Sequence, residues 1–105
     1  MNIRYSKQFK QQVSELYAYL KYTFGKHTAI ATRDEIIKQM TLLKSFPDMG
    51  TIELSLDDQE IVYRYLIVAH SKIIYSVESD YIFVRLLWDC RQNPNKMQDL
   101  VNKVD

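Results

Sequence analysis

The stretch that decides the fold is IVYRYLIVAHSKIIYSVESDYIFVRLLWDCR, residues 61–91. It contains three runs rich in β-branched and aromatic residues, separated by short polar segments. Such runs are typical of β-strands, and we expect strands near 61–69, 72–78 and 81–88. These strands form the centre of the predicted sheet.

The connections between these strands are short and polar. Only His70-Ser71 and Ser79-Asp80 separate the runs, so neighbouring strands are expected to pair antiparallel. Large apolar residues occur at both odd and even positions along each run. Both faces of the sheet therefore need cover, from the rest of the chain or from a partner.

A helical hairpin is expected before the sheet. Residues 2–5 alternate polar and apolar and predict a short first strand, after which Ser6 can cap a helix over 7–24. Phe9, Val13, Leu16 and Leu20 repeat at helical spacing, and Gly25 supplies a stop.

The second helix of the hairpin has two candidate starts. It is expected to begin after Thr28, or at Thr32, where Thr32-Arg33-Asp34-Glu35 matches a capping box. It should end near Ser45, because Pro47 disfavours the helical conformation at Phe46.

The remaining segments complete one domain. Residues 52–56 alternate as a half-buried strand, and Asn93-Pro94 predicts the start of a last helix. One side of that helix is formed by Met97, Leu100, Val101 and Val104. The sequence therefore predicts a single α+β domain over residues 1–105, in which an N-terminal strand and a helical hairpin pack on an antiparallel sheet.

The composition fits a soluble globular protein. The chain has 105 residues, 47% hydrophobic and 26% charged, and contains no apolar run near the roughly 20 residues that a membrane helix needs. With no signal-peptide pattern at the start, a cytoplasmic location and no membrane contact are expected. Cys90 is the single cysteine, so we expect no disulfide, metal site or cofactor.

The charge is unevenly distributed. Residues 1–46 carry eight Lys or Arg against three Asp or Glu, whereas residues 47–105 carry six against ten. The two parts thus sum to +5 and −4 within a net charge of +1. The basic residues 1–46 indicate one of three things: contact with an acidic partner, contact with nucleic acid, or a solvated lysine-rich helix surface.

From Ser6-Lys7-Gln8-Phe9 to Pro94 the chain resembles the RelE/ParE superfamily of bacterial toxins. The resemblance lies in a helical hairpin ending in Phe46-Pro47-Asp48-Met49-Gly50, an arginine opening a strand at Arg64, and the exit Trp-Asp-Cys-Arg-Gln-Asn-Pro at 88–94. It implies the toxin of a type II toxin–antitoxin module, which arrests growth until an antitoxin restrains it.

Three arginines are the candidate catalytic residues if the chain is a RelE-like, ribosome-dependent mRNA endonuclease. The resemblance places Arg64 on a phosphate and Arg91 on charge developing during cleavage, which guanidinium groups suit. Arg85 interrupts an apolar strand, where it pairs with Asp89 or lies on an open face. Alternatively, Arg64 forms an ion pair with Glu53 or Glu78.

Two features favour a ParE-like toxin, which inhibits DNA gyrase by binding. RelE-like ribonucleases usually carry a proton-transferring Tyr or His after the last arginine, and residues 92–105 contain neither. Tyr75 and His70 are the other candidates for proton transfer, but we expect Tyr75 to be a core residue and His70 to be a solvated turn residue. The sheet half is also acidic, which suits a polyanion poorly.

A cognate antitoxin encoded beside the toxin is the expected partner, and operator DNA is expected only through the toxin–antitoxin complex. We assign Lys10, Lys21 and Lys38 on the basic hairpin, with Trp88 and Asp89 at the end of the last strand, to partner contacts. No metal is expected to take part.

Overall fold

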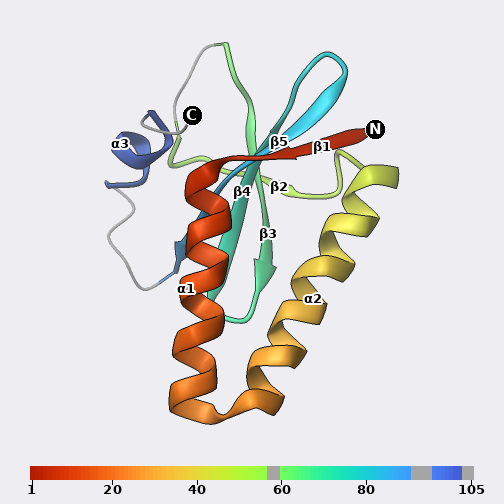
Figure 1. Ribbon diagram of the computed structural model, residues 1–105. Coiled ribbons are helices and arrows are strands. Elements are labelled where there is room, and N and C mark those ends of the chain that lie inside the picture. Colours follow the sequence, from red (N-terminus) through yellow and green to blue (C-terminus); the bar gives the residue numbers. More distant parts are fainter. Residues whose placement is uncertain (57–59, 91–95, 103–105) are drawn as a thin grey trace.

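The computed structural model describes residues 1–56, 60–90 and 96–102. Along this part of the chain the elements are β1 (Asn2–Tyr5), α1 (Lys7–Phe24), α2 (Lys26–Ser45), β2 (Thr51–Ile52), β3 (Tyr63–Val68), β4 (Ser71–Val77), β5 (Tyr81–Asp89) and α3 (Met97–Asn102). Their order confirms the predicted α+β fold, with a helical hairpin before the sheet and a short helix after it (Figure 1).

The strands form one sheet in the order β1-β5-β4-β3-β2. Strands β2 to β5 pair antiparallel, as predicted from the short turns. Strand β1 differs, because it lies parallel to β5, from Asn2 opposite Tyr81 to Tyr5 opposite Val84. Parallel neighbours need a long crossover, and the helical hairpin together with β2 to β4 supplies it.

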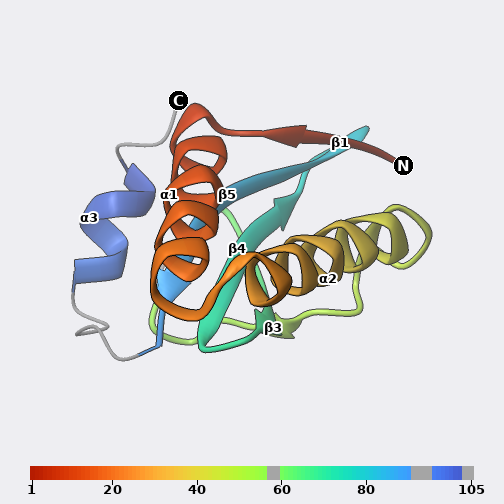
Figure 2. The ribbon, with the colours of Figure 1, turned by 60° about the horizontal axis from the view of Figure 1, so that its bottom comes forward.

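Both faces of the sheet are covered, which confirms the prediction from residue parity. The hairpin packs on one face, over a core that includes Phe9, Ile36, Met40, Leu43, Leu66, Val68, Ile73, Tyr75, Ile82 and Val84. The other face packs against α3 and the segment before β3, over Leu56, Tyr63, Ile74, Leu86, Trp88, Met97 and Val101. Figures 1 and 2 show α3 on the far side of α1 from α2.

Helix α2 begins earlier than either predicted start. A single residue, Gly25, joins the two helices with a φ of 101°, a conformation that side chains disfavour. Its N–H donates to the Leu20 and Lys21 carbonyls, and its own carbonyl accepts the Ala29 N–H. The turn is therefore complete at Gly25, and the capping-box match at Thr32 lies inside the helix.

The strand predicted over 52–56 is mostly absent. Strand β2 contains only Thr51 and Ile52, after which the chain turns. Glu53 and Leu56 are buried, whereas Leu54 is 89% exposed, so the alternation marks a turn rather than a strand. The predicted helix start at Asn93-Pro94 lies outside the described residues.

Candidate functional site

Arg64 lies on the face of the sheet that the hairpin covers. It stands opposite Tyr75 in the register of β3 and β4. Its Nη1 donates to the carbonyl of Gly50 at 2.8 Å and to that of Asp48 at 3.3 Å, and its Nε lies 3.9 Å from Asp48 Oδ1. The guanidinium thus holds the segment between α2 and β2 against the sheet.

Tyr75, opposite Arg64 on the neighbouring strand β4, holds the same segment between α2 and β2. Its hydroxyl donates to the Pro47 carbonyl at 2.8 Å and accepts the Gly50 N–H at 2.9 Å. A Cβ at Gly50 would lie 2.5 Å from this hydroxyl oxygen, so a larger residue does not fit. Burial raises the Tyr75 pKa, opposed in part by the Gly50 hydrogen bond and the Arg64 charge. Tyr75 is fully buried, which confirms it as a core residue.

Arg85 lies on the opposite face, at an irregularity in the pairing of β4 and β5. Tyr75 stands opposite Val84 and Ile74 opposite Leu86, so Arg85 is the extra residue of a β-bulge. Its side chain, 12% exposed, donates to Ser76 Oγ at 3.1 Å and to Glu78 Oε1 at 3.2 Å. The ion pair is thus to Glu78 rather than to Asp89, and the open face expected for Arg85 is covered.

Aromatic rings enclose the Arg85 guanidinium. Arg85 Cζ lies 4.8 Å from the centre of the Phe83 ring and 5.2 Å from the centre of the Tyr63 ring. Cation–π contacts of this kind stabilise a desolvated guanidinium inside the fold. Arg85 is therefore held by its own chain on several sides.

The structure does not bring Arg64 and Arg85 together. They lie on opposite faces of the sheet, and each is bound by acceptors of its own chain. Arg91 lies outside the described residues. The predicted ion pair of Arg64 with Glu53 or Glu78 is wrong. Glu78 instead pairs with Arg85. Glu53 pairs with Lys72, whose Nζ lies 2.6 Å from Glu53 Oε2.

Glu53 is held as a carboxylate. Its burial tends to raise the pKa, but the hydrogen bonds from Lys72 and the Ser55 N–H and the Lys72 charge outweigh this effect and lower the pKa overall. Lys72 also lies 4.3 Å from the centre of the Tyr65 ring. This cluster ties the turn after β2 to β4. His70, in the β3–β4 turn, is exposed as predicted.

The position of α1 is fixed by two polar side chains along β5. Ser6 caps the helix by accepting the Phe9 N–H at 2.9 Å, and its hydroxyl donates to the carbonyl of Arg85 at 2.7 Å. Gln12 Oε1 accepts the Leu87 N–H at 2.8 Å. Both contacts fall beyond the end of β1, where the edge of β5 would otherwise stay unpaired. Helix α1 therefore serves as the cover of this edge.

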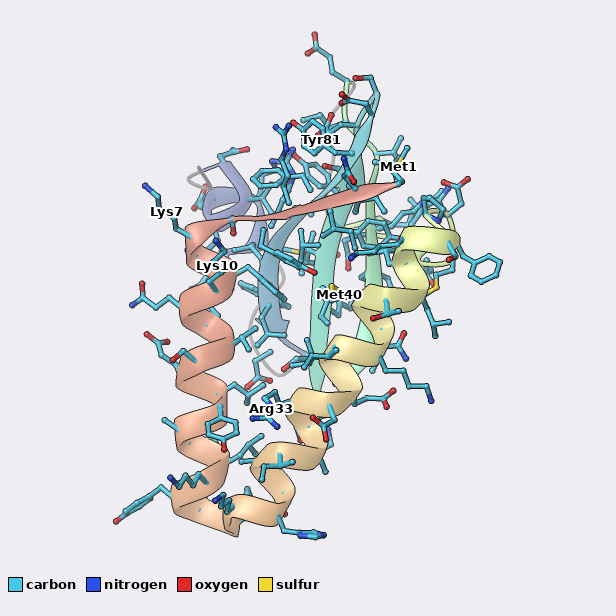
Figure 3. All side chains as sticks on the ribbon, turned by 45° about the vertical axis from the view of Figure 1, so that its right-hand side comes forward. Met1, Lys7, Lys10, Arg33, Met40 and Tyr81 are labelled. Atoms are coloured by element: carbon cyan, nitrogen blue, oxygen red, sulfur yellow. The ribbon has the colours of Figure 1, made fainter. Side chains whose placement is uncertain are left out.

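A groove opens between the two helices. The helices meet at Gly25 and spread apart towards β1, which crosses the open end (Figure 1). The groove has a volume of about 420 Å³ and is lined by Tyr5, Phe9, Lys10, Val13, Ile36, Ile37, Met40, Thr41 and Lys44. Its lining is thus mainly apolar with two lysines. Figure 3 shows Lys10 and Met40 on the two helices that border it.

The groove was not predicted, although some of its lining residues belong to the apolar pattern of the helices. Val13 belongs to the apolar repeat predicted for the first helix and lines the groove, as does Ile37, which is 56% exposed. Burial raises the pKa of the Tyr5 phenol above its ordinary value. Among the described residues, no three His, Cys, Asp or Glu side chains gather as metal ligands.

The predicted partner contacts fall in different places. Lys10 is exposed beside the groove, Lys38 is exposed on α2, and Lys21 is exposed in the last turn of α1. Trp88 is only 2% exposed, because its strand position directs the indole into the core with Met97 and Val101. The structure thus places the Trp88 indole in the core rather than on the surface, and Asp89 is half-buried at the end of β5.

None of the helices described is both long and apolar enough to cross a bilayer.

Comparisons with known proteins agree with the fold. Residues 3–94 match the family described as ParE toxin of type II toxin–antitoxin system, parDE. A solved structure titled "Chromosomal ParDE TA system from P. aeruginosa" is similar, with a TM-score of 0.69 and 13% sequence identity over 85% of this chain and 95% of that chain. No curated protein matches the sequence.

Proposed function

Because the chain belongs to the ParE toxin family of type II toxin–antitoxin systems, we propose that it arrests growth by binding DNA gyrase and stabilising the gyrase–cleaved-DNA state. This is the target that the ParE-like branch of the superfamily implies. The chain would act by occupying a macromolecule rather than by cutting one.

The observation that carries this proposal is the separation of Arg64 and Arg85. A metal-independent ribonuclease needs cationic and proton-transferring groups that converge within hydrogen-bond reach of one phosphate. Here the two guanidiniums lie on opposite faces of the sheet, and their hydrogen bonds go to Gly50, Ser76 and Glu78. This arrangement supports a toxin that inhibits by binding.

The proton-transfer candidates give the same support. The Tyr75 hydroxyl is fully buried with both a donor and an acceptor, and the Glu53 carboxylate is bound by Lys72. His70 is exposed in a turn. Tyr75 is close to Arg64, but its hydroxyl is committed to the Pro47 carbonyl and the Gly50 N–H, which supports a structural role rather than proton transfer.

The groove between α1 and α2 is the proposed site of the antitoxin. Apolar side chains such as Val13, Ile37 and Met40 suit the apolar face of an amphipathic segment, and Lys10 and Lys44 suit acidic residues beside it. Operator DNA would be bound only through the antitoxin in this complex. The antitoxin and gyrase would both meet the toxin in the cytoplasm.

Expression of the chain without its antitoxin tests the proposed target. If gyrase is trapped on cleaved DNA, arrested cells become filamentous and their chromosomes carry double-strand breaks, while mRNA 5′ ends stay unchanged. Pulsed-field electrophoresis and 5′-end sequencing of the same culture measure both. Arrest with an intact chromosome and new mRNA ends would exclude gyrase and assign the chain to the RelE-like nucleases.

A further inference from the structure

The tip of the helical hairpin, residues 19–28, exposes three aromatic rings. Tyr22 is 94% exposed, Phe24 62% and Tyr19 55%. Rings of this size are seldom left in water without a use when they gather at one point of a small protein. We propose that the hairpin tip binds nucleic acid by stacking on unpaired bases.

The tip presents these rings on a firm support. Gly25 is the only residue between α1 and α2, and its backbone is hydrogen-bonded to both helices. The Tyr19 and Phe24 rings meet edge to face, with 6.3 Å between their centres. A firm support lowers the entropy that binding costs. Tyr22, almost wholly exposed, is the ring most open to a stacked base.

The charge around the rings suits a polyanion. Lys21, Lys26 and His27 are exposed at the tip. Residues 16–33 contain three Lys or Arg and no Asp or Glu. The C-terminal end of α1 and the N-terminal end of α2 meet at the tip, so their dipoles oppose each other and the net charge there comes from the side chains. Phosphates beside the stacked bases would meet lysine side chains and no carboxylate of residues 16–33.

Stacking on bases fits the tip better than insertion into a membrane. Two of the three exposed rings are tyrosines, and Thr23 and Thr28 lie among them. A membrane-surface helix needs a continuous apolar face along its length. Base stacking needs only isolated rings beside positive charge, and it tolerates any sequence because every base has a flat face.

The tip is distinct from the groove. The groove lies where the helices spread apart near Tyr5 and Lys44, whereas the tip is the end at which they meet (Figures 1 and 3). Nucleic-acid binding at the tip is therefore independent of the antitoxin site, and it does not rest on gyrase being the target.

Fluorescence anisotropy with labelled single-stranded dT20 and rU20 tests the proposal on the isolated chain at low salt. The double variant Tyr22→Ala/Phe24→Ala should bind at least fivefold more weakly, as expected for the loss of stacked bases. Phe46→Ala is the matched control, because Phe46 is 60% exposed at the opposite end of α2. It should bind as the unaltered chain does.

Lysine variants test the charge separately. Lys21→Gln/Lys26→Gln should reduce the slope of log affinity against log salt by about 0.7 for each lysine that contacts a phosphate. Lys44→Gln, at the far end of α2, should leave the slope unchanged. Absence of binding to both oligonucleotides, or equal effects of tip and control variants, would overturn the proposal. Binding only to anionic phosphatidylserine vesicles would overturn it in favour of a membrane surface.

Discussion

Arg64 and Arg85 both direct their hydrogen bonds into their own chain. The sequence shows two arginines in apolar strands, which indicates either a phosphate site or internal ion pairs. Their partners could not be predicted, because a turn after β2 and a bulge in β5 determine which carboxylate faces which guanidinium. By contrast, Tyr75 was predicted correctly as core, since burial follows from its place in a central strand.

Arg64→Gln should destabilise the fold by roughly 1–3 kcal/mol, because the charged hydrogen bonds to the Gly50 and Asp48 carbonyls are lost. Urea unfolding followed by circular dichroism measures this change. Arg33→Gln is the control, since Arg33 has a side chain 48% exposed and pairs with an exposed Asp34. Its effect should stay within about 0.5 kcal/mol.

A different result at Arg64 would point to catalysis. Unchanged unfolding together with complete loss of toxicity would mean that the guanidinium binds a phosphate rather than its own backbone. Variants that fold and still arrest growth agree with an anchoring role.

The elements themselves followed closely from the pattern of the sequence. Helix α1, its Ser6 cap and strands β3 to β5 were all predicted near their observed bounds. The parallel pairing of β1 and the groove were not, since both depend on how distant segments meet. The position of α1 on the sheet depends on the contacts of Ser6 and Gln12 with β5, which no local pattern reveals.

Charge reversal beside the groove should weaken antitoxin binding. Lys10→Glu would place a negative charge next to the proposed acidic segment, and we expect a loss of about tenfold or more in affinity, measured by calorimetry with the cognate antitoxin. Lys7→Glu is the matched control on the same helix, because Lys7 points away from the groove in Figure 3. Equal losses for both variants would exclude the groove as the specific contact.

The whole molecule combines a shared fold with an uneven charge distribution. A TM-score of 0.69 at 13% identity shows that the architecture is retained while most side chains differ, and a fold of this kind does not determine its target. The sheet half carries ten Asp or Glu against six Lys or Arg. Such a surface suits a protein partner better than an extended run of RNA.

The central claim, inhibition of gyrase by binding, is tested most directly with purified components. Gyrase, relaxed plasmid and ATP are incubated with the chain, and the DNA is resolved after treatment with detergent and protease. We predict loss of supercoiling and accumulation of linear, cleaved plasmid, with the same result for Lys10→Glu because the groove is proposed to bind the antitoxin and not gyrase. Full supercoiling without cleaved DNA at a molar excess of the folded chain would contradict the account.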